Sequence, residues 1–407
     1  MKKIRFASNL LVIITATFFL TIASGQIMAI EIRKITPPNL NPDHLGKHIL
    51  CYRPMRREHP EMDLEKPEYL HYFMPFMTVK AAEQKIIINN YGHGGSGWTL
   101  APGAAKYVTD LLEQSNGEQL DKNTPIAIIG AGVLGLFNAL ELHNRGYTNI
   151  TIYAEEFDNL TSHNAGGLLA PVSMDNDPEF KKTIEQIGID AYKFYKAIAL
   201  KQNKQIPNGA RIVPTYFSNR EDSGLEPYVG KVMQPAKDVL VDFQNGTTHQ
   251  MVVYDDGIFM DTAGLMHSLD QYLKKSHIKF VKEKINDFAE IKQNIIFNCT
   301  GLGAKQLNND DKLVSVQGHL VMLKNQAPKD INYMMIVYFD KGMTKNNQKI
   351  KRSFYIFPKQ LFQSKPVDIG VIGGTFVDGA DASTPNTEEF AILLDAARKF
   401  YGLEKQR

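Results

Sequence analysis

The sequence contains few of the residues that build disulfide scaffolds or metal clusters. Only two cysteines, Cys51 and Cys299, occur among its 407 residues. No spacing of cysteine and histidine fits a metal site, so we expect no bound metal. Cys299 follows an apolar run and is predicted to be a buried thiol, while a single disulfide between these two distant positions stays open.

The chain also lacks an excess of charge of either sign. The formal net charge is +2, and Lys2, Lys3 and Arg5 lie in an N-terminal leader, so the sum without them is +2 − 3 = −1. No basic stripe occurs elsewhere, which argues against nucleic acid as a partner. With 43% hydrophobic residues, the chain can bury one large core or two interlocked ones.

Long hydrophobic runs are absent beyond the N-terminus. Residues 1–29 have a basic start, an apolar stretch from Leu10 to Ile22 and small residues before Gln26. This pattern is typical of a secretory signal peptide, with cleavage after Gly25 or Ala29. An uncleaved anchor is the alternative, because the apolar run approaches the ~20 residues that a membrane span needs. We therefore expect an exported protein, periplasmic or secreted, with no stable membrane association after cleavage.

No convincing Ser/His/Asp triad or pair of catalytic carboxylates is present, but a glycine fingerprint is. Ile126–Gly135 reads as a buried strand followed by a Gly-x-Gly-x-x-Gly turn, and a helix is predicted from Val133 to Arg145. The first glycine permits the tight turn, the second lets the backbone approach a pyrophosphate, and the third lets helix and strand pack closely. Amides at the helix start would then hold the diphosphate. The predicted cofactor contacts of this turn are Gly130, Ala131, Gly132, Val133, Leu134 and Gly135.

An acidic residue follows the next predicted strand, at 149–154. Glu155 lies twenty residues beyond Gly135, the spacing at which a carboxylate accepts hydrogen bonds from an adenine ribose. Strand, turn, helix and acid together predict a βαβ unit that binds a dinucleotide. The pattern does not distinguish FAD from NAD.

A second glycine-rich segment comes before the fingerprint. Asn90–Thr99 reads Asn-Tyr-Gly-His-Gly-Gly-Ser-Gly-Trp-Thr. It resembles a segment near the carboxyl terminus of D-amino acid oxidases, where it normally follows the fingerprint, so the resemblance implies a circularly permuted FAD-dependent amine oxidoreductase. We expect His93 to form hydrogen bonds within this turn rather than to act in catalysis. By the resemblance, the residues that wrap the flavin are Gly94, Gly95, Ser96, Gly97, Trp98 and Thr99.

Further cofactor contacts follow from the same resemblance. The stretch from Tyr153 to Pro171 is similar to the corresponding part of D-amino acid oxidases, and Asn298–Gly301 matches their strand-end turn beneath the cofactor. Hydroxyl groups can form hydrogen bonds with the FAD phosphates, and small residues let the backbone lie close to the flavin. For Thr161 and Ser162 an ordinary helix cap is the alternative. The contacts implied are Glu155, Glu156, Thr161, Ser162, Gly166, Gly167, Leu168, Ile285, Thr300 and Gly301.

Two residues match substrate-binding positions of that family. Arg53, in Tyr52-Arg53-Pro54, aligns with the arginine that grips the substrate carboxylate through its planar fork. Tyr355 matches the second carboxylate contact, with a core aromatic as the alternative. The family's second tyrosine corresponds to Lys351, with Arg352 beside it. Either these cations favour acidic substrates or the loop is different and solvated.

The motifs predict an α/β fold in which a Rossmann-like FAD-binding domain is interleaved with a mixed-sheet substrate-binding domain, in circularly permuted order. The predicted helices cover 100–113, 133–145, 178–201, 262–276 and 387–401. The predicted strands cover 49–57, 85–89, 126–129, 149–154, 210–216, 250–254, 258–260, 278–283, 294–299, 314–323, 354–358 and 368–376. The expected segments are the signal peptide (1–29), a connector (30–48), the permuted segment with arginine strand, flavin loop and helix (49–120), the Rossmann core (121–175), a mainly substrate-domain part (176–275), a return to the FAD domain (276–310), the substrate-domain sheet (311–376) and the C-terminal helix (377–407).

The resemblance implies oxidative deamination of D-amino acids by hydride transfer to FAD. The products would be an imino acid, then a keto acid and ammonia, with hydrogen peroxide if oxygen reoxidises the flavin. Oxidation of glycine or of a secondary amine is the first alternative. A flavin-binding protein without catalysis and an NAD-dependent dehydrogenase are the others. The expected partner is a small-molecule amino acid, and the oligomeric state stays open.

Overall fold

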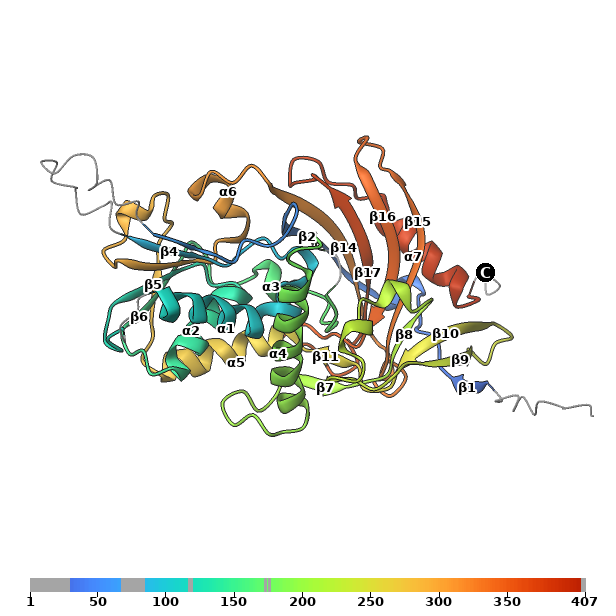
Figure 1. Ribbon diagram of the computed structural model, residues 1–407. Coiled ribbons are helices and arrows are strands. Elements are labelled where there is room, and N and C mark those ends of the chain that lie inside the picture. Colours follow the sequence, from blue (N-terminus) through green and yellow to red (C-terminus); the bar gives the residue numbers. More distant parts are fainter. Residues whose placement is uncertain (1–29, 67–84, 116–119, 172–173, 175–176, 404–407) are drawn as a thin grey trace, which may run out of the picture.

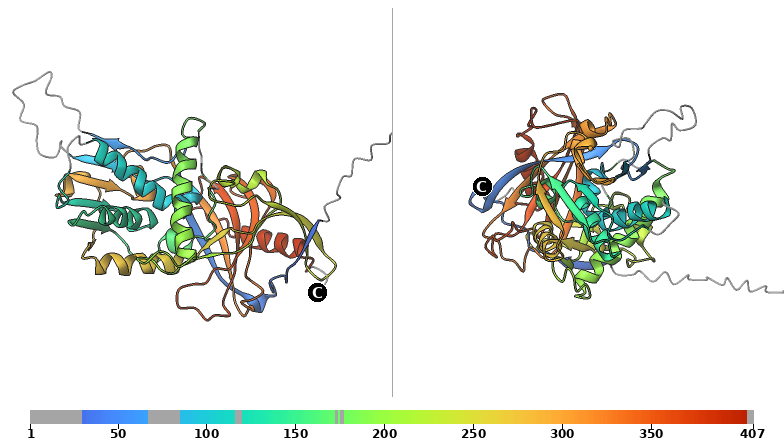
Figure 2. Two further views of the ribbon diagram at one scale, coloured as in Figure 1. Left: turned by 60° about the horizontal axis from the view of Figure 1, so that its bottom comes forward. Right: turned by 90° about the vertical axis from the view of Figure 1, so that its left-hand side faces the viewer.

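Two sheets organise the part of the chain that the computed structural model describes, which is residues 30–66, 85–115, 120–171, 174 and 177–403. The expected signal peptide at 1–29 lies outside these residues. Figure 1 shows a six-stranded sheet with its helices on the left and a nine-stranded sheet on the right. Helix α4 (Lys181–Ala199) stands between the two halves, as the left view of Figure 2 also shows.

The six-stranded sheet is the predicted nucleotide-binding sheet. Its strands pair in parallel except for β3, which pairs antiparallel with β4. Strand β4 precedes the fingerprint in the sequence but pairs with β13 from after it, with Asn89 opposite Asn298. Residues before the fingerprint are therefore built into this sheet. The strand order is β12 (Lys279–Lys282), β6 (Ile150–Ala154), β5 (Ile126–Ile129), β13 (Ile295–Asn298), β4 (Ile86–Asn89) and β3 (Leu64–Glu65).

Apolar side chains of these short strands point to both faces of the sheet. In β5, Ile126 and Ile128 belong to the large core cluster under the helices, while Ala127 and Ile129 belong to a separate cluster on the other side. Successive strand side chains point to opposite faces, so a strand that is apolar throughout must be covered twice. Helices α1 (Gly97–Ser115), α2 (Val133–Asn144) and α5 (Thr262–Lys275) pack against one another in the large cluster.

The nine-stranded sheet is mixed and carries the predicted substrate residues. Arg53 lies opposite Val316 in the pairing of β2 with β14, and Tyr355 lies opposite Gly373 in the pairing of β16 with β17. The strand order is β1 (Glu31–Lys34), β9 (Lys237–Asp242), β10 (Thr248–Tyr254), β8 (Thr215–Phe217), β15 (Met334–Met343), β16 (Lys349–Phe357), β17 (Val371–Asp378), β14 (Leu313–Leu323) and β2 (Leu45–Arg56).

Shorter elements and the last helix complete the described residues. Helix α7 (Glu389–Phe400) packs on β17, β16 and β14 through a second core cluster that includes Tyr401. The remaining elements are α3 (Thr161–Asn164), α6 (Ala304–Leu307) and the two-stranded pair of β7 (Ala210–Ile212) with β11 (Ile258–Met260). No helix within the described ranges is long and apolar enough to cross a membrane.

The predicted helices and strands are confirmed with shifts of a few residues at their ends, except that the single strand predicted at 210–216 is two strands, β7 and β8, in different sheets. The structure adds four strands that the sequence pattern did not indicate: β1, β3, β9 and β15. Strand β1 lies inside the expected connector and pairs in parallel with β9. In β15 only the first four residues are buried and the next six are exposed, and the apolar run from Met334 to Phe339 covers only part of the strand.

Candidate cofactor and substrate site

A large cavity of about 600 Å³ lies at the carboxyl ends of the parallel strands, where dinucleotides bind in open α/β sheets. Its walls include the fingerprint turn and the glycine segment that precedes it in the sequence. Both predicted glycine motifs therefore meet in one cavity. The predicted residues that line it are Arg53, Gly94, Gly95, Gly97, Trp98, Gly130, Ala131, Gly132, Val133, Leu134, Glu155, Glu156, Thr161, Ser162, Gly166, Ile285, Thr300 and Gly301.

The fingerprint glycines have the surroundings that a dinucleotide turn requires. A Cβ on Gly130, whose φ is +110°, would lie 2.4 Å from the carbonyl oxygen of Cys299, and one on Gly135 would lie 1.9 Å from that of Gly130. Gly132 is the N-cap residue of α2 and brings no capping side chain. The free amides at the start of α2 thus face the cavity with no side chain in between. Such a helix start fits a diphosphate. Gly135 itself packs within the βα unit and does not line the cavity.

Helix α3 closes one side of the cavity. The Ser162 hydroxyl accepts a hydrogen bond from the Val133 amide at 3.0 Å, so it caps α2 from a distant segment while it lines the cavity. Trp98 donates its indole N–H to the Ser162 carbonyl at 2.8 Å, and Thr161 donates to the Tyr52 carbonyl at 3.3 Å. The ring of Trp98 is buried and fixes the start of α1 to α3.

The predicted ribose and adenine contacts lie at the open edge. Glu155 is ion-paired with Lys284 at 3.3 Å, and Glu156 with Lys282 at 2.9 Å. The Thr300 hydroxyl donates to Asn298, whose amide continues to Asn89 at the end of β4. The carboxylate of Glu155 at this edge is consistent with the ribose end of a dinucleotide.

Four of the predicted flavin residues, Ser96, Thr99, Gly167 and Leu168, do not line the large cavity. Thr99 donates to the carbonyl of Ala170 at 2.9 Å and so fixes the segment after α3. Gly167, with a φ of +104°, and Leu168 line a smaller neighbouring cavity instead. Ser96 is buried at the start of α1.

The smaller cavity, of about 70 Å³, joins the large one through five shared lining residues: Arg53, Gly95, Trp98, Ala165 and Gly166. Arg53 and Tyr355 both line it, as predicted. Arg53 donates to the Thr375 carbonyl at 3.0 Å, and its guanidinium carbon lies 4.6 Å from the centroid of the Phe376 ring. Tyr355 stacks on Phe357, and burial raises the pKa of its hydroxyl well above the ordinary value, so the hydroxyl stays a donor.

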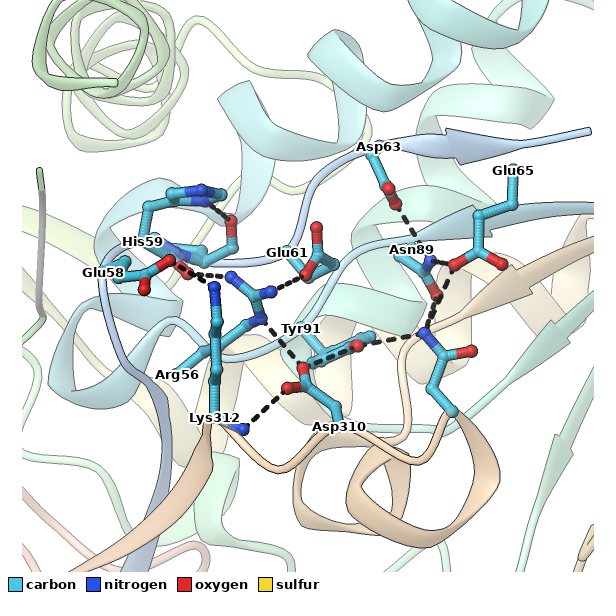
Figure 3. Close-up of polar contacts among 12 residues, drawn as sticks. Arg56, Glu58, His59, Glu61, Asp63, Glu65, Asn89, Tyr91, Asp310 and Lys312 are labelled. Atoms are coloured by element: carbon cyan, nitrogen blue, oxygen red, sulfur yellow. Dashed lines mark hydrogen bonds and ion pairs between the residues drawn. The ribbon is translucent and has the colours of Figure 1, made fainter. Parts of the chain in front are cut away.

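Neighbouring arginines are engaged elsewhere. Arg56 donates to Asp310 at 2.8 Å and to the His59 carbonyl at 3.2 Å, and is also ion-paired with Glu61. Figure 3 shows this arginine at the centre of the polar cluster that joins residues 56–65 to β4 and Asp310. Arg57 is ion-paired with Asp378 at 2.5 Å. Of these three arginines, only Arg53 lines the cavities.

The interpretation of Lys351 and Arg352 as cations at the edge of the substrate cavity is wrong. Arg352 donates twice to Glu389 and once to Asp340, each at 2.7 Å, on the α7 side of the sheet. Lys351 is exposed, and neither residue lines either cavity. Adjacent strand residues point to opposite faces, which directs Arg352 away from the face that Tyr355 presents. The alternative of a different, solvated segment fits Lys351.

The expected hydrogen bonds of His93 are absent. The side chain is fully buried at the cavity wall, and neither ring nitrogen has a partner among the described residues. This burial lowers the pKa of His93 to about 3, so the ring is neutral. The prediction of a buried thiol at Cys299 is confirmed, and burial raises its pKa to about 12. Cys51 is also free and buried, so the two do not form a disulfide.

A buried lysine supports the wall between the two cavities and was missed by sequence reasoning. Lys359 donates to the Thr262 hydroxyl at 2.7 Å and to the His163 carbonyl at 3.1 Å. Thr262 in turn donates to the carbonyl of Ala165, the residue before Gly166. Burial lowers the pKa of Lys359 to about 8. A lysine just after a strand gives no local signal of such a contact, because its partners come from two other segments.

Residues 125–406 match the protein family described as FAD dependent oxidoreductase, which covers more than half of the chain. The chain belongs to this family. Membership selects FAD over NAD as the cofactor of the large cavity, a choice that the fingerprint left open. It also confirms the predicted α/β fold class, apart from the permuted order, and the resemblance to D-amino acid oxidases.

Relatives in the family share limited sequence identity with this chain. A D-amino-acid oxidase of Dictyostelium discoideum is 25% identical over 220 residues, which are 51% of this chain and 59% of the relative. A D-amino-acid oxidase of Fusarium vanettenii is 25% identical over 227 residues, which are 50% and 61%. The chain thus spans about three fifths of the length of these relatives. Among solved structures, an iminodiacetate oxidase from a Chelativorans species is 14% identical, with a TM-score of 0.46 over 69% of this chain and 80% of that one.

Proposed function

We propose that this protein is an FAD-dependent enzyme that oxidises the amine-bearing carbon of small D-amino acids. One observation carries the proposal. Arg53 and Tyr355, from opposite ends of the sequence, line one small cavity that opens into the cavity of the FAD fingerprint. A guanidinium fork beside a protonated phenol suits a carboxylate.

The chain's own groups would hold the substrate rather than exchange protons with it. Arg53 would donate from its N–H groups to the substrate carboxylate, and the Tyr355 hydroxyl would donate to the same carboxylate. Bound FAD supplies the acceptor for the hydride that leaves the α-carbon. The described residues that line the small cavity include no aspartate, glutamate, histidine or lysine, so the amine must lose its proton to water before it is enclosed. The imino acid formed would hydrolyse to a keto acid and ammonia after release.

The walls of the small cavity favour a neutral substrate side chain. Apart from Arg53, it is lined mainly by apolar and aromatic residues, among them Leu168, Phe217, Ile336, Phe357 and Phe376. An acidic side chain would lose its hydration there without a cation to pair with. The volume of about 70 Å³ favours small groups, which keeps glycine and N-methyl amino acids as the second candidate substrates.

The test is anaerobic mixing of the purified holoenzyme with D-alanine, D-valine, D-glutamate, glycine, sarcosine and L-alanine. We expect loss of the oxidised flavin band with D-alanine and little change with D-glutamate or L-alanine. Faster reduction by glycine or sarcosine would establish the second candidate instead. Absence of reduction by any of these amines would support the alternative of a flavin-binding protein without catalysis. Admission of air afterwards shows whether oxygen is an acceptor.

We further propose that the family order is circularly permuted in this chain. The family match begins at residue 125, yet Arg53 and the glycine segment of residues 94–99 face the same cavities as the matched part. In this interpretation the first described residues supply what relatives carry at their carboxyl end. Exposed, adjacent ends are what such a rearrangement needs.

Export also remains a proposal, based on the leader at residues 1–29. Mass spectrometry of the protein recovered from producing cells would test it. A mature N-terminus at Gln26 or Ile30 supports cleavage, and a full-length, membrane-bound product supports the anchor.

A further inference from the structure

The guanidinium of Arg53 occupies the space where a side chain of residue 318 would be. An ideal Cβ on Gly318 would lie 2.4 Å from one terminal nitrogen of Arg53, 2.6 Å from Cζ and 2.7 Å from the other nitrogen. These similar distances mean that the group lies across the glycine rather than pointing at it with one atom. Thr375 accepts from one of its nitrogens, and the ring of Phe376 lies against it. We call Gly318, Thr375 and Phe376 the arginine seat.

Tyr355 lies on a bare glycine in the same manner. A Cβ on Gly373, its partner across β16 and β17, would lie 2.5 Å from both Cζ and the hydroxyl oxygen. A Cβ on Gly166 would lie 3.3 Å from that oxygen. The Arg53 guanidinium and the Tyr355 ring thus lie directly against the sheet, because the glycines beneath them have no side chains. This leaves the space of the small cavity on their other side.

Pairing with β2 holds the backbone under Arg53. Gly318 of β14 lies opposite Cys51 of β2, while the pairing of β14 with β17 shifts between Gln317 and Leu320. The group in conflict with a new Cβ is the end of a flexible side chain, so an alanine there would displace the guanidinium and leave the strand in place. Gly374 differs, because its φ is +132° and its Cβ would strike the Ser353 carbonyl oxygen at 2.4 Å.

We propose that Gly318 is a positioning residue that sets the height and plane of the Arg53 guanidinium, and thereby decides whether the enzyme binds carboxylate-bearing amines. The proposal rests on the function proposed above, since it assigns the carboxylate to Arg53. A methyl group on residue 318 would push the guanidinium into the small cavity, where the carboxylate would be placed. An interaction whose strength depends on the alignment of two N–H groups is sensitive to such a shift.

The test compares wild type with Gly318→Ala, Arg53→Ala, the double variant and Gly342→Ala, all as FAD-loaded protein. Gly342 is the matched control, because it also lies in a strand and its Cβ would meet its nearest neighbour only at 3.9 Å. The binding probe is benzoate, a simple carboxylate, titrated against the flavin absorbance. KM and kcat for D-alanine are measured in parallel, and the melting temperature is recorded for every variant.

We expect Gly318→Ala to weaken benzoate binding and raise KM by about tenfold or more, with a smaller change in kcat and full FAD content. Gly342→Ala should stay within about twofold of wild type. In the Arg53→Ala background the Gly318→Ala change should add nothing, because the group that it displaces is gone. Equal effects of Gly318→Ala with and without Arg53, or wild-type binding by Gly318→Ala, would overturn the proposal.

Melting temperatures separate failure of this inference from failure of the proposed function. If the wild type binds no carboxylate and is reduced by no amine, the proposed function fails. The seat can still be judged, because Gly318→Ala should then lower the melting temperature in the presence of Arg53 and less in its absence. If Gly318→Ala does not fold, Phe376→Leu removes the other contact of the seat and should weaken benzoate binding, also only when Arg53 is present. An equal loss of binding without Arg53 would overturn the proposal.

Discussion

Arg53, Arg56 and Arg57 lie within five residues at the end of β2, but they have different partners and therefore different roles. Arg56 is ion-paired with Glu61 and Asp310, and Arg57 is ion-paired with Asp378. Arg53, in contrast, faces the cavity. A partly buried guanidinium beside a cavity is suited to binding an anion. The chemistry of the residue type is identical in all three cases, so the neighbours decide the role.

Replacing Arg53 should therefore harm catalysis without loss of the cofactor. Arg53→Lys keeps the charge but loses the two-pronged geometry, and Arg53→Ala loses both. We expect kcat/KM for D-alanine to fall by roughly a hundredfold or more, with unchanged FAD content. Arg56→Ala is the control. It should lower stability through loss of the pairs with Glu61 and Asp310 and change kcat/KM much less. A reversed pattern would show that the substrate arginine is misassigned.

His93 should give the protein a measurable sensitivity to acid. Its pKa in the folded state is lowered to about 3, below the ~6.5 of an exposed histidine. The unfolded chain therefore binds a proton below about pH 6.5 that the folded chain does not, and stability is lost as the pH falls from there. The slope contributed is about 1.4 kcal/mol per pH unit.

The measurement is the free energy of unfolding in urea between pH 7 and pH 5, at saturating FAD. His93→Gln should show a shallower decline than wild type. His267→Gln, which changes an exposed histidine of α5, should decline as wild type does. Parallel curves for wild type and His93→Gln would mean that His93 is not buried as a neutral ring.

Among the secondary-structure elements, α7 is anchored to the back of the nine-stranded sheet by one buried ion pair. Arg352 of β16 and Glu389 at the start of α7 face each other with both N–H···O contacts at 2.7 Å, and the Glu389 side chain is 1% exposed. Asp340 of β15 joins the pair from a half-exposed position. A buried pair that loses one partner leaves an uncompensated charge, which costs more than the pair contributes.

Glu389→Gln should therefore destabilise the fold by roughly 3–5 kcal/mol. Asp340→Asn removes a solvent-screened contact of the same arginine and should cost at most about 1 kcal/mol. Unfolding in urea would measure both. Neither change should alter the ratio of activity on D-alanine to activity on D-glutamate, since Arg352 faces away from the cavity. A shift of that ratio would show that Arg352 acts at the substrate site after all.

At the scale of the whole molecule, the residues before the fingerprint are part of both sheets. Strand β4 completes the nucleotide-binding sheet and β2 closes the nine-stranded one. The last helix returns to the first described residues: Arg398 donates to the Leu40 carbonyl at 2.8 Å, and the rings of His48 and Phe390 are 4.8 Å apart. Figure 2 shows α7 and β1 at the same end of the molecule. The two ends of the described chain are neighbours.

A rearranged chain should consequently fold. It would begin at residue 120, run to residue 403, pass through a flexible linker of roughly ten residues and end with residues 35–115. We expect a yellow, soluble protein with FAD content and melting temperature close to wild type, because every core contact except those of β1 is kept. The control is opened between Gly318 and His319 in β14, which breaks a strand paired on both sides and should not fold. Failure of the first chain to bind FAD would argue against the permuted order.

The sequence by itself determined the parts of this protein that depend on local spacing. Gly130, Gly132 and Gly135 with their flanking strand and helix follow from backbone sterics within ten residues, so the dinucleotide turn could be placed. Arg53 and Tyr355 were paired only through the resemblance to a family, because no local rule joins positions so far apart. The tertiary structure alone decided where Arg352 points, that His93 has no partner and that Lys359 supports the cavity wall. It alone revealed β1, β3, β9 and β15, and that Gly318 makes room for Arg53. Each of these depends on contacts between segments far apart in the sequence, and such contacts are set by the packing of the whole core rather than by any short stretch of the chain.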